Sequence, residues 1–210
     1  MKYIALIAGL LLFSCQSQGN DKEAKTATQE INYQELDTAT FAGGCFWCVE
    51  ASFEQIQGVV EAVSGYAGGD KESADYGLVS SGRTAHAEAV QVYFDPSVID
   101  YETLLEIFFT AHDPTQLNRQ GPDVGSQYRS EIFYHNEEQK QLAEAKMKEL
   151  APDFSNPIVT KMSKLDGFFM AEEYHQDYEE KHPNNGYIVN VSRPKIEKVA
   201  KKFKDRLKKN

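Results

Sequence analysis

Two cysteines flank the single tryptophan of the chain in the stretch GGCFWCVE, residues 43–50. Thiols three residues apart can bind a metal, form a structural disulfide, or carry out redox and nucleophilic chemistry. The chain contains three cysteines in all. If Cys15 has a separate role at the N-terminus, Cys45 and Cys48 are the two thiols that remain to act as a pair.

A zinc site is the first use to consider, because His86-Ala87-Glu88 together with a C-x-x-C resembles the signature of zinc deaminases. In those enzymes the histidine motif precedes the cysteines, whereas here the order is reversed and no second C-x-x-C completes a structural site. A structural disulfide between residues three apart closes a very small loop and therefore stabilises weakly. Redox or nucleophilic chemistry is the favoured interpretation.

The position of the pair predicts different roles for the two thiols. Apolar residues at 46, 49, 53 and 56 recur at helical spacing, so a helix should begin at or just after Cys45 and end near Gly58. The positive end of a helix favours a thiolate, and we expect it to lower the pKa of Cys45 most. Cys48 should be more buried and less acidic. Cys45 is thus the predicted attacker and Cys48 the predicted resolving thiol.

Glu88 is a candidate proton donor. The stretch AEAVQVYF at 87–94 alternates as a strand does and puts Glu88 on the same face as three apolar residues. Burial there would raise the pKa of its carboxyl and keep it protonated near neutral pH. The alternative is that Glu88 reaches solvent at the strand end. Phe46 and Trp47 either form an aromatic wall suited to a methyl group on sulfur or belong to the core.

The elements that must position these residues follow from hydrophobic periodicity and turn signals. We expect strands at 36–42, 59–66, 87–94, 128–135 and 158–165, and helices at 45–58, 101–111, 137–150, 171–181 and after Pro194. Through residue 150 the order is β-α-β-β-α-β, which is that of a ferredoxin-like split βαβ sandwich with helices on one face. The predicted class is therefore α+β, with appended C-terminal elements.

Composition narrows the class of protein. With 210 residues, 41% hydrophobic and 26% charged, the chain can form one globular domain with a substantial core. Its formal net charge of −10 argues against a nucleic-acid-binding surface, which needs a basic excess. Residues 195–210 are locally basic, and a solvated helix face is favoured there over a contact with acidic lipid or a partner. Nothing in the sequence requires more than a monomer.

The N-terminal sequence has the pattern of a bacterial lipoprotein. Lys2 precedes an apolar run at 4–13 that is too short to span a bilayer but has the length of a signal-peptide core. The run ends in LFSC, which resembles a lipobox whose cysteine is lipidated. We expect a signal peptide at 1–14, a flexible tether at 15–35 that begins with lipidated Cys15, and one domain at 36–210. The alternative is ordinary secretion with a leftover thiol.

Five motifs occur in an order that resembles the peptide methionine sulfoxide reductase A family. They are FAGGCFWCVEASFEQIQGV, SGYAGG, RTAHAEAVQVYFDP, FFTAHDPTQLNRQGPDVGSQYRSEIFY and AEEYHQDY. The resemblance covers about residues 39 to 190, and the α+β fold of the family agrees with the element order above. It implies reduction of methionine S-sulfoxide, free or in proteins, to methionine.

The resemblance also implies roles for individual residues. Cys45 attacks the sulfoxide sulfur, Phe46 and Trp47 form the pocket for the substrate methyl group, and Glu88 protonates the departing oxygen. Cys45 is left as a sulfenic acid, which condenses with a second thiol to a disulfide. An external thioredoxin-like dithiol then reduces that disulfide, and no metal or bound cofactor is needed.

Four further residues receive roles from the same resemblance. Tyr76 and Tyr128 donate hydrogen bonds to the departing oxygen. The loop that carries Asp123 and the helix that carries His175 complete the wall and orient the methionine backbone.

The sequence departs from the family pattern in its second thiol. Many members have glycine where Cys48 stands, and a resolving cysteine near the C-terminus, often after Gly-Tyr; here that region reads GYI at 186–188. The resolving role therefore moves to Cys48. The resemblance of residues 12–15 to a lipobox predicts an enzyme of the bacterial cell envelope, anchored to a membrane with its domain outside the cytoplasm. The competing hypotheses are a thiol-disulfide exchange protein that uses Cys45 and Cys48, and a lipid-anchored binding module.

Overall fold

A computed structural model describes residues 33–209. The signal peptide predicted for residues 1–14, the lipidated Cys15 and most of the tether lie outside the described residues. Within residues 33–209, the helices are all too short or too polar to cross a membrane.

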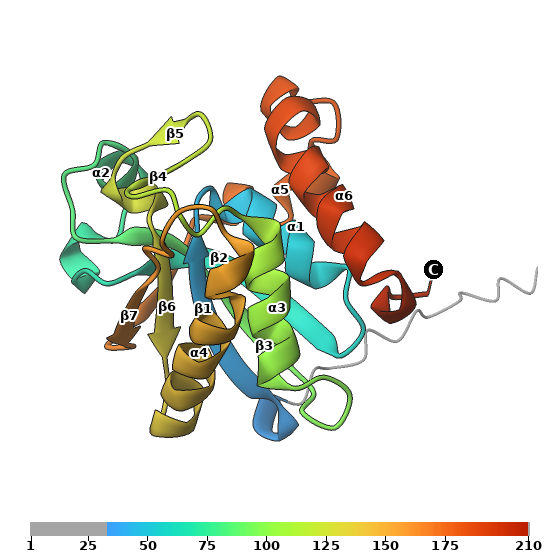
Figure 1. Ribbon diagram of the computed structural model, residues 1–210. Coiled ribbons are helices and arrows are strands. Elements are labelled where there is room, and N and C mark those ends of the chain that lie inside the picture. The colour runs from blue at the N-terminus through green and yellow to red at the C-terminus, as the bar shows by residue number, and fades with distance from the viewer. Residues whose placement is uncertain (1–32, 210) are drawn as a thin grey trace, which may run out of the picture. The chain divides into compact units, whose positions relative to one another are not determined.

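A six-stranded sheet with the order β7-β6-β1-β3-β2-β8 forms the centre of the domain (Figure 1). The strands are β1 (Asp37–Gly43), β2 (Val59–Ala67), β3 (Ala87–Phe94), β6 (Ser130–Tyr134), β7 (Lys161–Lys164) and β8 (Phe168–Met170). The four inner strands β6, β1, β3 and β2 are antiparallel neighbours. At the edges, β7 pairs with β6 in parallel and β8 pairs with β2 in antiparallel fashion.

The crossover helices complete the predicted fold. α1 (Phe46–Glu54) connects β1 to β2, and α3 (Tyr101–Ala111) lies between β3 and β6. This order and pairing are those of a ferredoxin-like split βαβ arrangement, so the predicted α+β class is confirmed. The edge strands β7 and β8 are the appended elements.

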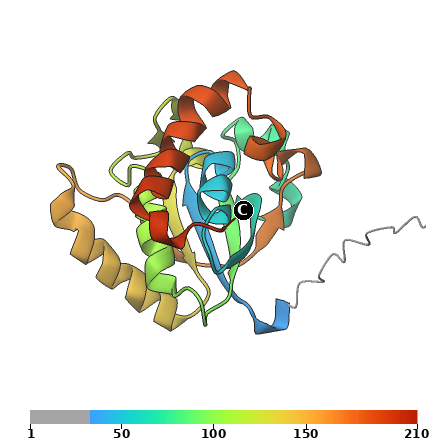
Figure 2. The same cartoon turned by 90° about the vertical axis from the view of Figure 1, so that its right-hand side faces the viewer.

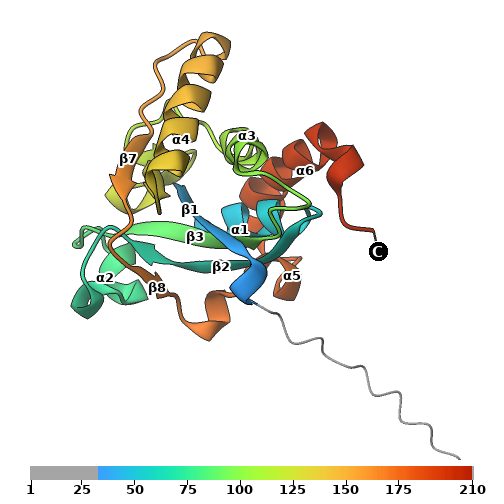
Figure 3. The ribbon, with the colours of Figure 1, turned by 90° about the horizontal axis from the view of Figure 1, so that it is seen from below.

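Helices cover one face of the sheet. Figure 3 shows α1, α3, α4 (Glu137–Leu150) and α6 (Arg193–Lys202) on the same side. Figure 2 shows α6 in red beside α1 in cyan and α3 in green, in agreement with their contacts. The core between the layers is centred on buried Phe41 of β1, whose ring lies 5.3 Å from that of Phe53 and 5.0 Å from that of Phe108. Burial of these rings holds both crossover helices to the strand that leads to Cys45.

Helix starts follow from capping side chains. Asp100 accepts a hydrogen bond from the backbone N–H of Thr103 (2.8 Å), and Asn136 accepts one from the N–H of Gln139 (2.8 Å). Each cap satisfies an N–H group that the first helical turn leaves without a partner. The helices predicted at 101–111 and 137–150 are confirmed at these bounds.

The helix predicted over 171–181 is wrong. A 3-10 turn (Glu173–His175) is followed by a break at Asp177, which has φ 52°, and by the short α5 (Tyr178–Lys181). The break has a clear cause in Gln176, whose side chain bonds both the N–H and the carbonyl of Ser64 at 3.0 Å and so holds the segment against β2. Strand β8, just before it, was not predicted.

Two regions predicted to be loops contain short elements. α2 (Tyr76–Ser80) begins after Asp75, whose side chain accepts the N–H of Leu78. β4 (Arg119–Gln120) and β5 (Asp123–Val124) pair with each other. The predicted strands at 128–135 and 158–165 are shorter in the structure, where they form β6 and β7.

Candidate active site at the start of α1

Cys45 lies at the N-terminal end of α1, as predicted. β1 ends at Gly43, and Gly44 has φ +97°, a conformation that side chains other than hydrogen rarely tolerate. A Cβ at Gly44 would also lie 2.6 Å from Gln120, so the tight turn requires glycine. Cys45 precedes the first helical residue, Phe46, and its sulfur therefore lies near the positive end of the helix.

Glu88 lies beside this turn and is buried. Its side chain is on β3, is only 2% exposed, and accepts a hydrogen bond through Oε2 from the backbone N–H of Phe46 (3.1 Å). Burial raises the pKa of Glu88 to about 8, although the Phe46 N–H acts in the opposite direction. The alternative in which Glu88 reaches solvent is wrong, and at neutral pH the carboxyl carries a proton.

Aromatic rings form a wall beside Cys45. Phe46 is buried, while Trp47 is partly buried and stacks on Tyr178 with ring centroids 3.8 Å apart. The Trp47 Nε1–H donates to Nδ1 of His175 (3.2 Å), so the proton of the neutral ring is on Nε2. Nε2 is buried without a hydrogen-bond partner in the described residues, and burial lowers the pKa of His175. The site thus contains one free ring donor.

Tyr76 and Tyr128 approach Glu88 from different elements. The Tyr76 ring, on α2, lies 4.3 Å from that of His175, and burial raises the Tyr76 pKa to about 12. The pKa of Tyr128 is also raised, first by burial and then by the Glu88 charge. Neither hydroxyl has a hydrogen-bond partner within residues 33–209, so both can donate to an oxygen atom brought beside Glu88.

Glu172 fixes Tyr76, and the sequence did not single it out. One carboxylate oxygen accepts the backbone N–H of Tyr76 (3.0 Å), and the other accepts the hydroxyl of Tyr66 (2.8 Å). Glu172 precedes the 3-10 turn that carries His175. The signal that could have identified Glu172 from the sequence was its place, as a polar residue, inside the AEEYHQDY motif.

Tyr187 was also missed as a site residue. Its hydroxyl donates to Asp123 Oδ2, and it also interacts with the Cys45 thiol, whose pKa it lowers. Its ring meets Trp47 edge-on at 5.9 Å. Tyr187 therefore joins the loop of Asp123 to the first turn of α1. In the sequence it was visible only as the tyrosine after Gly186.

The two sulfurs differ in acidity, and the predicted order is wrong. Burial raises the pKa of Cys45 well above its usual range, and its interaction with Cys48 acts in the same direction. The interaction with Cys45 lowers the pKa of Cys48 to about 7, with further help from Lys195 and Ser192 against the effect of burial. Desolvation outweighs the helix dipole at Cys45. Cys48 was expected to be the more buried thiol, but both are buried, at 5% exposure for Cys45 and 2% for Cys48.

Comparison with known proteins decides the family. The family model described as "Peptide methionine sulfoxide reductase" matches residues 37–207. The chain belongs to the peptide methionine sulfoxide reductase family. It is 54% identical over 172 residues to the MsrA reductase of Natronomonas pharaonis, covering 81% of this chain and 97% of that protein. It is also 54% identical over 172 residues to that of Thermus thermophilus, covering 82% and 98%.

Solved structures are similar in sequence and fold. Mxr1 of Saccharomyces cerevisiae in reduced form has a TM-score of 0.69 and 37% identity, covering 72% of this chain and 88% of that chain. Methionine sulfoxide reductase A of Corynebacterium diphtheriae has a TM-score of 0.64 and 34% identity, covering 71% and 76%. The predicted family and the predicted enzyme class, an oxidoreductase that reduces peptide methionine sulfoxide, are confirmed.

The geometry of this reductase suits thiol chemistry. Cys45 and Cys48 are both free thiols, and Cys45 interacts with the buried carboxyl of Glu88 and directly precedes the aromatic residues Phe46 and Trp47. Among residues 33–209, there is no group of three or more His, Cys, Asp or Glu side chains placed to hold a metal ion. The described residues thus bring together two thiols and one buried carboxyl at the start of α1.

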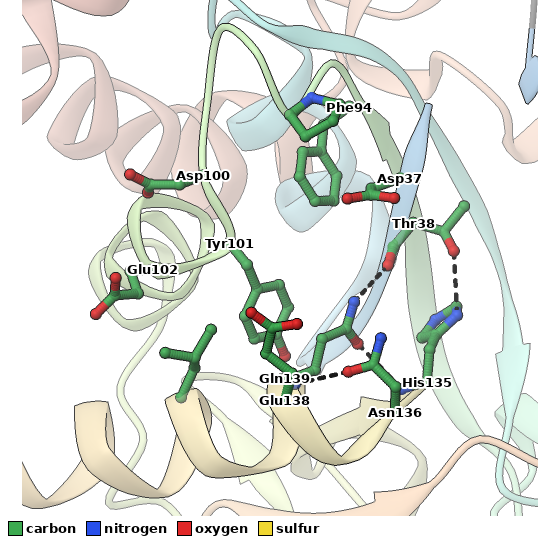
Figure 4. A pocket seen from close by; sticks show the side chains of 12 residues that line it. Asp37, Thr38, Phe94, Asp100, Tyr101, Glu102, His135, Asn136, Glu138 and Gln139 are labelled. Atoms are coloured by element: carbon green, nitrogen blue, oxygen red, sulfur yellow. Dashed lines mark hydrogen bonds between the residues drawn. The ribbon is translucent and has the colours of Figure 1, made fainter. Parts of the chain in front are cut away.

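A separate cavity of about 380 Å³ lies at the other end of β1 (Figure 4). It is lined in part by Asp37 and Thr38 at the strand start, while Cys45 follows the strand end. Its polar groups bond one another: Gln139 Nε2 donates to the Thr38 carbonyl (2.7 Å), and His135 contacts the Thr38 hydroxyl (3.1 Å). This cavity is not part of the candidate active site of the reductase.

Proposed function

We propose that this reductase acts on methionine S-sulfoxide, free or in proteins, through a Cys45 sulfenic acid and a Cys45–Cys48 disulfide. One observation carries the proposal: the protonated, buried Glu88 carboxyl lies against the backbone of Phe46, the residue after Cys45. A sulfoxide bound with its sulfur at Cys45 has its oxygen within reach of that proton. Nucleophile and acid are then on the same side of the substrate.

The first half-reaction balances with the groups present. The Cys45 proton passes to the Cys48 thiolate as the Cys45 sulfur attacks the sulfoxide sulfur, and Glu88 protonates the sulfoxide oxygen. The sulfur–oxygen bond of the substrate then breaks and the oxygen is transferred to Cys45. The products are methionine and a Cys45 sulfenic acid, and Glu88 is left as a carboxylate that regains its proton from solvent. Methionine sulfoxide is reduced and the thiol is oxidised by the same two electrons.

The surrounding side chains bind the substrate. Tyr76 and Tyr128 donate hydrogen bonds to the sulfoxide oxygen, because their hydroxyls lie near Glu88 and have no other partner in the described residues. Phe46 and Trp47 contact the methyl group, as apolar rings beside the sulfur.

His175 and Asp123 act on the methionine backbone. His175 can donate through its free Nε2–H. The Asp123 carboxylate, oriented by the Tyr187 hydroxyl, accepts a hydrogen bond from a backbone N–H.

The second half-reaction uses Cys48. Its sulfur attacks the Cys45 sulfur, the bond between that sulfur and oxygen breaks, and the oxygen leaves as water with the Cys48 proton. The resulting disulfide connects two residues on one helical turn. An external dithiol of the thioredoxin type then reduces it, with no bound cofactor. The yeast relative Mxr1 was solved in complex with Trx2, at a TM-score of 0.51 and 29% identity over 71% of this chain and 91% of that chain.

The N-terminal residues anchor the enzyme in this proposal. Residues 1–14 are a cleaved signal peptide, Cys15 is lipidated, and residues 15–35 connect the membrane to the domain at 36–210, in the bacterial cell envelope outside the cytoplasm. The sequence pattern supports this assignment. β1 starts at Asp37 and reaches Gly43 after about 20 Å, so a tether would join the domain at the strand end opposite the cysteines. Loss of lipid labelling in Cys15→Ser, with unchanged labelling in Cys48→Ser, is the expected result in cells.

The function is tested with purified reduced protein and separated sulfoxide epimers, in the absence of external reductant. The expected release is one methionine per enzyme from the S epimer and none from the R epimer. Wild-type protein should end as the Cys45–Cys48 disulfide, and Cys48→Ser should end as a sulfenic acid that a dimedone reagent labels on Cys45. Cys45→Ser is the inactive control. No release from either epimer, or sustained thioredoxin-coupled turnover by Cys48→Ser, would contradict the proposal.

A further inference from the structure

The Cys48 sulfur lies in a polar site formed by the C-terminal part of the chain. Ser192 Oγ is 3.0 Å from Cys48 Sγ, and Lys195 Nζ is 4.0 Å from the same atom. Cys48 and Ser192 are buried and Lys195 is partly buried, so solvent screens these contacts less than it would at an exposed surface. Ser192 and Lys195 lie outside the five motifs that resemble the family.

The backbone of this segment places Ser192 specifically. Residues Ile188–Ser192 form a π-helical turn that leads directly into α6 (Figure 1). A π turn inserts one extra residue into a helical turn and is frequent at functional sites. Ser192 precedes the first residue of α6 but does not cap the helix with its side chain. Its hydroxyl contacts Cys48 instead.

The charges around Cys48 favour a negative sulfur. Lys195 supplies a positive charge, and the N-terminal end of the ten-residue α6 adds the positive end of its dipole. The Cys45 thiol interacts with Cys48 from the preceding helical turn. Asp123 opposes a thiolate, but its carboxylate is engaged by the Tyr187 hydroxyl. The groups that favour the thiolate thus outweigh the one that opposes it.

We propose that Ser192 and Lys195 are positioning residues for the resolving cysteine. They stabilise the Cys48 thiolate before the Cys45 proton is transferred to it and again when the disulfide is reduced, so that Cys48 is the sulfur released when an external dithiol reduces the disulfide. The reductant therefore attacks Cys45 and forms its mixed disulfide there. This inference rests on the Cys45–Cys48 disulfide of the proposed function.

The exchange steps follow from this assignment. A thiolate of the reductant attacks the Cys45 sulfur, the Cys45–Cys48 bond breaks, and its electron pair leaves on Cys48 beside the Lys195 ammonium. The sulfur that forms the more stable thiolate is the better leaving group. The second thiol of the reductant then attacks its own bonded sulfur, releases reduced Cys45 and leaves the reductant oxidised.

Ionisation of Cys48 gives the first test. In a Cys45→Ser background, which keeps a hydroxyl beside Cys48, the pH dependence of thiolate absorbance and of iodoacetamide labelling is measured. Lys195→Met should move the midpoint upward by about one pH unit or more, and should slow labelling at pH 7 about fivefold. Lys195→Arg should restore the midpoint. Lys198→Met, one turn further along α6, is the matched control and should leave it unchanged.

Trapping of the mixed disulfide gives the second test. The oxidised wild-type protein is mixed with a thioredoxin whose second active-site cysteine is serine, and the joined peptides are mapped by mass spectrometry. The expected bond is to Cys45, formed about tenfold more slowly in Lys195→Met and at the wild-type rate in Lys198→Met. A bond to Cys48, or equal rates and midpoints in Lys195→Met and Lys198→Met, would overturn the inference while leaving the proposed function intact. If wild-type protein forms no Cys45–Cys48 disulfide, the proposed function itself fails.

Discussion

The surroundings of Cys45 and Cys48 differ sharply although one helical turn separates the two sulfurs. Cys45 directly precedes the rings of Phe46 and Trp47 and interacts with the Glu88 carboxyl, whose pKa burial raises to about 8. Cys48 faces a hydroxyl and an ammonium group. Of the groups near Cys45, the Phe46 and Trp47 rings are on α1 and Glu88 is on β3, whereas those around Cys48 come from the π turn and α6.

The different surroundings of the two sulfurs suit two different chemical steps of the proposed reaction. Reduction of a sulfoxide needs a proton at the substrate oxygen and an apolar surface for the methyl group, and both are provided at Cys45. Formation and reduction of a disulfide need a stable thiolate, and the charges that provide it are at Cys48. Burial keeps the proton on Cys45, so the first thiolate of the pair forms at Cys48. In the proposed reaction, one helical turn thus carries a neutral nucleophile, Cys45, and its base, Cys48.

Glu88→Gln should have the largest effect on the Cys45 side. The glutamine side chain has the same size but cannot supply an acidic proton, so methionine release in the first turnover should fall by about 10²–10⁴-fold. In the wild-type enzyme the rate should decline as pH rises through about 8, because Glu88 then loses its proton. The variant should lack this descending limb. Single-turnover rates measured across this pH range test both effects.

The same substitution separates the reductase from a thiol-disulfide exchange protein. Exchange between the reduced Cys45–Cys48 pair and a small disulfide needs no proton donor for a sulfoxide oxygen, so Glu88→Gln should change its rate less than about threefold. Equal losses in both assays would indicate a structural role for Glu88. An unchanged rate of methionine release would remove Glu88 from the reaction.

Tyr187→Phe should have an intermediate effect on methionine release, because Tyr187 connects the surroundings of Cys45 with those of Cys48. Its hydroxyl contacts both Asp123 and Cys45, and its loss leaves a partly buried carboxylate without its donor. Methionine release in the first turnover should fall about tenfold, the loss expected for one hydrogen bond to a charged group. Tyr178→Phe is the matched control, because its ring still stacks on Trp47 and its hydroxyl contacts only Asn185 among the described residues. Similar rates in the two variants would contradict a role for the Tyr187 hydroxyl.

The Cys45 side could be predicted from the sequence because its signals are local. The spacing of apolar residues placed the start of α1 at Cys45, and the alternation along β3 placed Glu88 on a buried face. The order of elements indicated the four inner strands. The helix at 171–181 failed because Gln176 bonds the backbone of Ser64, more than a hundred residues away, and that contact leaves no periodic signal.

The Cys48 side could not be predicted for the same reason. Ser192 and Lys195 are about 145 positions from Cys48, and Lys195 is one of many lysines in a basic stretch. A π turn has no reliable sequence pattern, so its effect on Ser192 is visible only in three dimensions. The predicted acidity of Cys45 failed because a dipole argument takes no account of how deeply the chain buries a thiol.

Glu50→Gln should have the smallest effect on activity. It tests the effect of burial on a carboxyl that has no role in the proposed reaction. Glu50 is on α1, as buried as Glu88, and burial together with the Glu54 charge raises its pKa to about 8. A carboxyl whose pKa is raised on folding binds its proton more tightly in the folded state, so the stability of the wild-type protein falls as pH rises from about 4.5 to about 8. The neutral amide of the variant removes that contribution.

The Glu50→Gln variant should therefore match the wild type in methionine release. Its free energy of unfolding should exceed that of the wild type by roughly 1–3 kcal/mol at about pH 9 and should show no such gain at about pH 4. Urea unfolding at the two pH values measures the difference, and a gain that is equal at both would show that Glu50 is not protonated by burial.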